Sequence, residues 1–225
     1  MVSDFKQLHD VLSQYRQSKV WCFRGHADER WKLVPKIGRP PYFWVNERRV
    51  LESWKRRALQ YVTHSIRSDW DWLAIAQHHG LATRLLDWST NPLNAAFFAV
   101  REQWDGNAVI YAARFYQEQP RDDDDPFEVR GVFSFFPRGV VPRIIRQGGL
   151  FTIQETPTIA LEDGVEGLEE LHKIIVAQAY RSELLSELSF YGINDASLFP
   201  DLDGLGGFLN WTIESKEYWN RSSEE

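Results

Sequence analysis

The feature that most constrains the fold is a helix with sharp ends that a strand follows at once, over residues 91–115. Asn91 can cap a helix with its side chain, Pro92 suits the first turn, and an apolar run follows. The turn pair Asp105-Gly106 comes next, and the sequence NAVIYAARF after it is typical of a buried strand. Helix and strand in direct succession predict a fold that mixes both.

The rest of the chain consists of similar short elements. Apolar residues spaced by three and four mark helices, the first of which Ser3 would begin, and β-branched and aromatic runs mark strands, the first of which Gly25 would end. Helices are predicted over 4–17, 46–66, 70–79, 91–104 and 180–190, strands over 19–24, 107–115 and 173–176, and short strands with turns over 131–153. Because helices and strands do not alternate regularly, we expect an α+β fold. It would be a single mixed domain over 1–219, with a central, partly antiparallel sheet flanked by helices and a polar, disordered tail over 220–225.

The composition is that of a globular protein in water. The 225 residues can bury a sizeable core, and no apolar run approaches the roughly 18 residues that a membrane span needs. The first ten residues lack the apolar core of a secretory signal, and the single cysteine, Cys22, cannot form an internal disulfide. We therefore expect a cytoplasmic protein with no membrane partner.

Charge is distributed unevenly along the chain. The formal net charge is −6, yet the first 67 residues hold 14 of the 26 lysines and arginines and only 6 of the 32 acidic residues. A basic front can meet an anionic ligand or partner, and it can equally be neutralised by the acidic rear within one fold. The sequence leaves both interpretations open.

Several well-known catalytic motifs are absent from the sequence. It has no GxxxxGK[ST] phosphate loop, no GxGxxG after a strand, no GxSxG and no HExxH. His78 and His79 are adjacent, so they would point in different directions on a helix, and no Cys/His spacing fits zinc. The sequence therefore predicts no metal site.

Two segments gather polar groups that a core does not require. In residues 21–26, Arg24 stands at a strand end before a glycine, so a ligand can approach a fixed cation closely; an ion pair with an acidic side chain is the alternative. In residues 77–92, many polar side chains lie between two helices. There Arg84 and Asp87 can pair with each other, and such bracing is compatible with a ligand site.

A third segment, residues 143–152, combines arginine and glutamine with two glycines before an apolar run. Gly148-Gly149 fits a hairpin turn, and it can equally leave room for a ligand. We therefore treat all three segments as candidate parts of one binding site.

These three segments, in this order, resemble the FRG domain family, which is named for a Phe-Arg-Gly motif. The match comprises Phe23-Arg24-Gly25, the run QHHGLATRLLDWSTNPLNAAFFA over 77–99 and RIIRQGGLFT over 143–152, and it extends into 192–204. His26 and His79 stand where the family more often has glutamine and an aromatic or small residue. The resemblance implies a bacterial protein that acts in phage defence or in stress responses.

The same segments also resemble the three-part NAD site of ADP-ribosyltransferases. That resemblance implies that Arg24 engages the phosphate or ribose of NAD, that Ser89 and Thr90 orient the nicotinamide side, and that Trp88 or Phe98 stacks on the nicotinamide ring. Active members place a glutamate on a late strand. The positional match in this chain is the neutral Gln147, with Glu155 as the other candidate.

The candidate site can therefore be stated residue by residue. The catalytic residues would be Arg24, Ser89 and Gln147, and the residues that bind NAD would be Arg24, Gly25, His26, Thr83, Arg84, Asp87, Trp88, Ser89, Thr90 and Phe98. The expected function is that of an NAD-binding, ADP-ribosyltransferase-like enzyme, with NAD as its substrate and an unknown macromolecular target such as a phage or host protein.

The alternative is a non-catalytic module that recognises a protein or single-stranded nucleic acid. Ten tryptophans offer stacking surfaces, and a basic cluster on the second predicted helix offers phosphate contacts. The cluster comprises Arg48, Arg49, Lys55, Arg56 and Arg57. The net charge of −6 argues against general binding of duplex nucleic acid, so nucleic acid is the less favoured partner.

Overall fold

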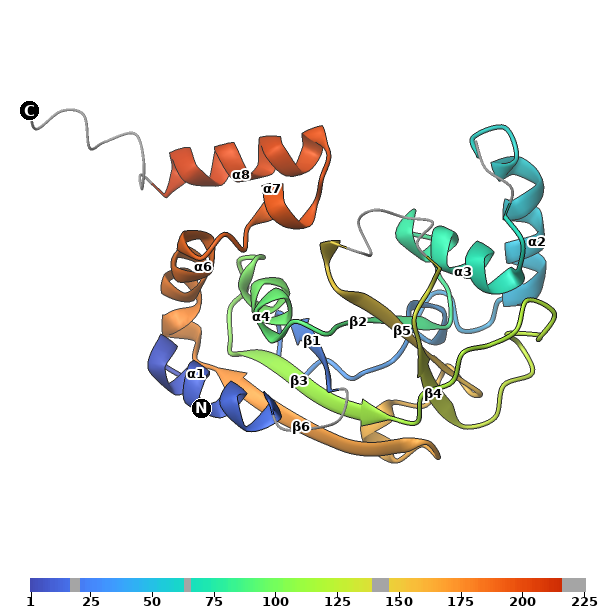
Figure 1. Cartoon of the computed structure of the whole chain (residues 1–225), viewed down its shortest axis with the longest axis horizontal. Coiled ribbons are helices and arrows are strands. Elements are labelled where there is room, and N and C mark those ends of the chain that lie inside the picture. Colours follow the sequence, from blue (N-terminus) through green and yellow to red (C-terminus); the bar gives the residue numbers. More distant parts are fainter. Residues whose placement is uncertain (17–20, 63–65, 139–145, 216–225) are drawn as a thin grey trace, which may run out of the picture.

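The computed structural model describes residues 1–16, 21–62, 66–138 and 146–215 (Figure 1). Its helices are α1 (Phe5–Ser13), α2 (Glu47–Ala58), α3 (Asp69–His78), α4 (Pro92–Val100), α6 (Arg181–Phe190), α7 (Asp195–Leu198) and α8 (Leu202–Glu214). Its strands are β1 (Cys22–His26), β2 (Leu85–Ser89), β3 (Ala108–Phe115), β4 (Val132–Phe135), β5 (Gly149–Gln154) and β6 (Leu168–Val176). The predicted disordered tail, residues 220–225, lies outside the described residues. The first three residues of the third candidate segment, 143–145, lie outside them as well.

The strands form one six-stranded sheet in the order β4-β5-β2-β1-β3-β6. Every strand pair described in it is antiparallel, which confirms the predicted α+β class and sharpens the expectation of a partly antiparallel sheet. The two central strands barely meet, because β1 and β2 pair only at Phe23 and Ser89. By contrast, β1 pairs with β3 along its whole length, from Cys22 to His26. The sheet is therefore split near its middle.

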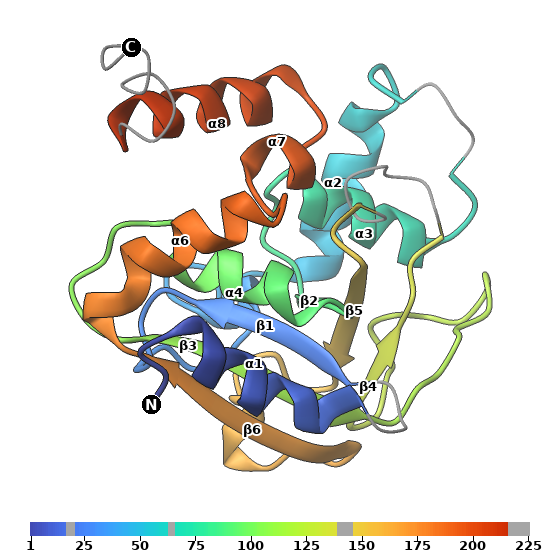
Figure 2. The same ribbon diagram turned by 60° about the vertical axis from the view of Figure 1, so that its left-hand side comes forward.

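Apolar residues cover both faces of the central strands. On β3, Ile110 belongs to a core cluster shared with α1, α4 and α6, whereas its neighbour Tyr111 belongs to a cluster on the opposite face. This alternation follows from the two-residue repeat of a strand. A third cluster joins α2 and α3 to β2, β4 and β5. Figure 2 shows α4 and α6 stacked above β1 and β3, with α8 on their far side.

The helix boundaries follow local capping. The Asn91 side chain accepts a hydrogen bond from the Leu93 backbone N–H, as predicted, and Gly80 and Gly192 follow α3 and α6 with φ values of +82° and +81°. Asp4, and not Ser3, caps α1, through a 2.8 Å hydrogen bond from the Gln7 N–H. A carboxylate is favoured there because the helix dipole presents positive charge at that end.

Several predictions about elements are wrong or incomplete. Helix α2 ends at Ala58 and not near residue 66, α4 ends at Val100 and not at residue 104, and β6 begins at Leu168 and not at residue 173. Gly25 does not end β1, which continues to His26. The segment between α3 and α4 contains the strand β2, although its polar composition indicates a loop. The two helices α7 and α8 were missed, and α8 contains three glycines that lower its helix propensity.

Candidate functional site

A cavity of about 370 Å³ opens where β1 and β2 separate. Residues from three distant segments line it, since Arg24 comes from β1, Ser89 ends β2, and Gln147 lies in the turn before β5. Arg39, Gln77 and Phe98 complete much of the wall. The volume lies within the range of roughly 300–1,000 Å³ that is usual for small-molecule sites. The structure thus brings together the three segments that the sequence singled out.

The Arg24 guanidinium bridges the gap between the two strands. Its Nη1 donates a 2.6 Å hydrogen bond to the backbone carbonyl of Asp87, and the same nitrogen lies 3.6 Å from Asp87 Oδ2. Its Nε donates to His26 Nε2 over 3.0 Å. These contacts fix the plane of the guanidinium and leave 20% of the side chain exposed. Arg24 is therefore an oriented cation beside the cavity.

His26 is a neutral acceptor for this arginine. Burial, and next the positive charge of Arg24, lower the pKa of His26 to about 3. Because Nε2 accepts the hydrogen bond from Arg24, the ring proton must be on Nδ1, which lies 3.3 Å from the Trp31 carbonyl and donates to it. A charged imidazole could not hold Arg24 in this way. His26 thus positions Arg24.

A chain of hydrogen bonds behind the cavity orients Asp87. The buried Thr83 hydroxyl donates to Gln77 Oε1 over 2.6 Å, and Gln77 Nε2 then donates to Asp87 Oδ2 over 2.9 Å. Asp87 remains 55% exposed at its side chain, so its carboxylate is accessible from the cavity. Thr83 itself does not line the cavity and acts through Gln77.

Ser89 and Gln147 hold β2 and the turn before β5 together. The Ser89 hydroxyl donates to the Gln147 carbonyl over 2.6 Å and accepts from the Asn91 N–H over 3.0 Å. Gln147 Nε2 donates to the Leu198 carbonyl over 3.1 Å. Gln147 is two residues ahead of β5, not on the strand as the resemblance implies. Its amide anchors α7 as well as lining the cavity.

The turn at Gly148 requires glycine. Its φ is +58°, and a Cβ at this position would lie 2.8 Å from Thr90 Oγ1. The Thr90 backbone N–H and hydroxyl both donate to the Gly148 carbonyl. Thr90 is thus engaged with this turn and does not line the cavity. Glycine here serves chain reversal and the close approach of Thr90.

Gly25 has a different reason to be glycine. A Cβ there would lie 2.0 Å from the Ala95 carbonyl oxygen and 2.5 Å from the Ala99 nitrogen, both in the backbone of α4. The expectation that Gly25 leaves space for a ligand is therefore wrong on that side, because α4 fills the space. The glycine lets α4 pack directly on β1 beside the cavity.

Arg84 lies behind the site and is paired elsewhere. Its Nε donates to Glu47 Oε2 over 2.8 Å, its backbone N–H donates to Glu47 Oε1 over 2.7 Å, and its guanidinium lies over the Phe127 ring. Both side chains are about 90% buried, and burial raises the pKa of Glu47. The predicted pairing of Arg84 with Asp87 is wrong, because Arg84 points into this second, buried contact and away from the cavity.

Two aromatic residues of the predicted set differ in accessibility. Trp88 is 3% exposed, its Nε1 donates to Thr152 Oγ1, and its ring packs edge-on against Phe115. Its ring is thus committed to the core, although the residue contributes to the cavity wall. Phe98 is partly exposed and lines the cavity, so it is the better placed of the two for stacking on a ligand.

Glu155 does not belong to this cavity. It follows the far end of β5, where its side chain accepts a hydrogen bond from the Gly131 N–H. Gly149, at the near end of β5, is the residue that pairs with Ser89. Of the two late candidates, only Gln147 lines the cavity with Arg24.

Arg39 is a cavity residue that the sequence did not reveal. It comes from the loop between β1 and α2, and burial together with the charge of Arg24 lowers its pKa. Within the described part of the chain it forms no ion pair. No local pattern marks it, because it stands in a proline-rich loop without periodicity. Two arginines therefore face one cavity, an arrangement suited to an anionic group.

The basic cluster on α2 is partly neutralised. Arg48 pairs with Asp125 over 2.6 Å, and Lys55 contacts both Glu52 and Asp69. These ion pairs favour the interpretation in which the basic first third of the chain is neutralised within the fold.

No group of three potential metal ligands occurs among residues 1–16, 21–62, 66–138 and 146–215. None of the helices in these ranges is long and apolar enough to cross a membrane.

The fold and the cavity define an α+β protein with an arginine-lined cavity at the split of its sheet. Residues 19–108, which run from just before β1 into the start of β3, match the family model of the FRG domain. The chain therefore contains an FRG domain over residues 19–108, and the predicted resemblance is confirmed for these residues. No curated protein and no solved structure matches the chain.

Proposed function

We propose that the protein binds NAD in the cavity between β1 and β2 and cleaves its nicotinamide–ribose bond, as an ADP-ribosyltransferase-like enzyme. The observation that carries this proposal is that Arg24, Ser89 and Gln147, separated by more than 120 positions, line one cavity. The two arginines suit the phosphates of the dinucleotide, and Phe98 offers a ring for stacking.

The chemistry requires a stabiliser of positive charge. When the bond from the ribose C1′ to the nicotinamide nitrogen breaks, its electron pair leaves with nicotinamide and positive charge develops on the ribose. An acceptor nucleophile then bonds to C1′ and releases its proton to solvent, without oxidation or reduction. Gln147 is neutral, so we assign the stabilising charge to Asp87, the carboxylate that contacts Arg24.

Calorimetry with NAD⁺ tests the binding step. Arg24→Ala should weaken binding about thirtyfold, because a charge-assisted hydrogen bond contributes roughly 1.5–3 kcal/mol. Arg114→Ala is a matched control, since its side chain is also 20% exposed but pairs with Glu169 and Glu170 outside the cavity. Absence of NAD⁺ binding by the wild type, or equal binding by Arg24→Ala, would refute the proposal.

A cellular role can be proposed from the resemblance to the family. We propose that the activity serves phage defence in the bacterial cytoplasm, as the resemblance to FRG proteins implies. The same Arg24→Ala variant extends the test, because phage plating should fall when the wild type is expressed and recover with the variant. Equal plating on both strains would separate the biochemical activity from defence.

A further inference from the structure

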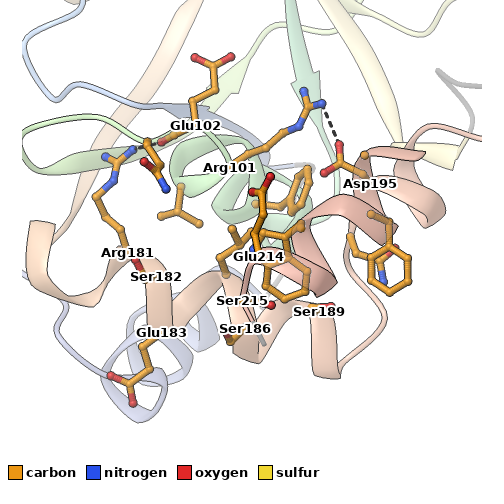
Figure 3. Close-up of a pocket in the computed structure, with 18 of the residues that line it drawn as sticks. Arg101, Glu102, Arg181, Ser182, Glu183, Ser186, Ser189, Asp195, Glu214 and Ser215 are labelled. Atoms are coloured by element: carbon orange, nitrogen blue, oxygen red, sulfur yellow. Dashed lines mark hydrogen bonds and ion pairs between the residues drawn. The ribbon is translucent and has the colours of Figure 1, made fainter. Parts of the chain in front are cut away.

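A second, larger cavity lies on the helical side of the molecule. It is a groove of about 850 Å³ between the C-terminal end of α4 and the helices α6, α7 and α8 (Figure 3). Helix α8 forms its outer wall and packs chiefly on α7, away from the sheet. Nothing in the proposed NAD chemistry uses this groove.

Both arginines of the groove are already engaged. Arg101 Nη2 lies 2.8 Å from Asp195 Oδ1, and its guanidinium stacks on Phe199 with 4.5 Å to the ring centroid. Arg181 is buried and donates to the carbonyls of Ala27 and Glu102 over 2.7 Å each. Figure 3 shows the Arg101 guanidinium turned towards Asp195 and the Arg181 guanidinium turned towards Glu102. The groove thus offers little free positive charge.

Three of the four carboxylates that line the groove are not engaged with described residues, unlike Asp195. Glu102, Glu183 and Glu214 line it and are exposed, and they form no ion pair with any described residue. In Figure 3, Glu214 lies across the middle of the groove while Glu102 and Glu183 extend at its edges. The unpaired charge of the groove is therefore negative.

Aromatic rings lie beside these carboxylates. Trp104, Phe208 and Trp211 line the groove, and Trp104 is 41% exposed. Rings of this kind attract the cationic groups of lysine and arginine through their electron-rich faces. The phosphates of a nucleic acid would be repelled by the unpaired carboxylates, so the charges of the groove disfavour nucleic acid binding.

The groove also adjoins the NAD cavity. Glu102 lines both spaces, and the Trp104 ring packs against Trp31 of the other cavity with 4.9 Å between centroids. A chain lying in the groove can therefore present a side chain to a ligand in the cavity.

We propose that this groove binds a lysine- or arginine-rich polypeptide segment of the acceptor protein. The role as acceptor rests on the proposed NAD chemistry, whereas the preference for cationic polypeptide rests on the charges and rings of the groove alone. The acceptor is thus a basic protein, recognised by Glu183, Glu214 and the three aromatic residues.

Fluorescence anisotropy tests this binding without NAD. The probe is a labelled (Arg-Gly)4 peptide at about 50 mM salt. The competitors are (Glu-Gly)4, which is an acidic peptide, and oligo(dT)10, which is a single-stranded nucleic acid. The wild type should bind the arginine peptide, and the double variant Glu183→Gln/Glu214→Gln should bind it about tenfold more weakly, since each rim charge contributes a few-fold. The control Glu118→Gln/Asp123→Asn removes equal charge outside the groove and should bind as the wild type does.

The outcomes separate the two proposals. Equal loss in both double variants, no binding by the wild type, or preference for oligo(dT)10 would overturn the groove proposal. Calorimetry with NAD⁺ on Glu183→Gln/Glu214→Gln should match the wild type, because neither residue lines the NAD cavity. Peptide binding in a protein that fails to bind NAD⁺ would refute the NAD proposal and leave the groove assignment standing.

Discussion

The NAD cavity and the acidic groove differ in how their polar groups are used. In the cavity, Arg24, His26 and Asp87 are fixed by hydrogen bonds to one another and to the strands that carry them. In the groove, Glu102, Glu183 and Glu214 are exposed and form no ion pair with the described residues. Fixed groups suit chemistry, which needs a prearranged geometry, and free charges suit the capture of a flexible partner. Substitutions should therefore disturb the cavity and the groove in different ways.

The largest contrast concerns two glycines. Gly25→Ala should lower the free energy of unfolding by about 3 kcal/mol, since the new Cβ would meet the α4 backbone at 2.0 Å. Gly206→Ala on α8 should raise it by about 1 kcal/mol, because open space surrounds that position and alanine favours a helix. Urea denaturation measures both, and two effects of equal sign would contradict the comparison.

A second test concerns Asp87. Asp87→Asn keeps an oxygen that can accept from Gln77, so the fold and NAD⁺ affinity should persist. Release of nicotinamide should fall about a hundredfold, the order of loss seen when one charge-stabilising group is removed. The initial rate, measured by chromatography at saturating NAD⁺, decides this. An undiminished rate would show that Asp87 does not stabilise the positive charge on the ribose. Gln147 would then be the next residue to test.

A third test concerns a pH dependence at His26. Its pKa is about 3 in the folded protein, where the ring is buried among Arg24, Arg39, Lys173 and the edge of Tyr111, against about 6.5 when unfolded. The unfolded chain therefore binds the extra proton between these values, and stability falls as pH drops through this window, by up to about 1.4 kcal/mol per unit.

His26→Gln removes this titration while its amide oxygen can still accept from Arg24. Denaturation curves from pH 6.5 to 4.5 should therefore be flatter for the variant than for the wild type. NAD⁺ affinity at pH 7 should stay within about threefold, because the acceptor for Arg24 is retained. Parallel pH profiles would show that His26 does not titrate as described.

Much of the fold was predictable because its signals are local. Asn91 caps α4 through its own side chain, and the regular apolar spacing of α1 marks its buried face. The strand β2 escaped prediction because Asp87 and Ser89 read as loop residues. They are tolerated in a central strand only because the sheet splits beside them and a cavity exposes Asp87.

The site was predictable only in part. The sequence pointed to Arg24, Ser89 and Gln147, and all three line one cavity. It did not reveal Arg39, and it assigned Arg84 and Thr83 to the ligand although their contacts lie behind the cavity. A buried arginine and a site arginine look alike in sequence, since only their partners in space distinguish them.

The sequence alone determined the α+β class, the first residues of five helices to within one position and the resemblance to the FRG domain. Caps, periodicity and a dense motif are properties of neighbouring residues. Only the tertiary structure decided that β1 and β2 separate beside Ser89 and that the close packing of α4 requires glycine at position 25. It also decided that the carboxylates of α6 and α8 line a common groove. These features depend on contacts between residues far apart in the chain, and no local pattern encodes which distant partner a side chain will meet.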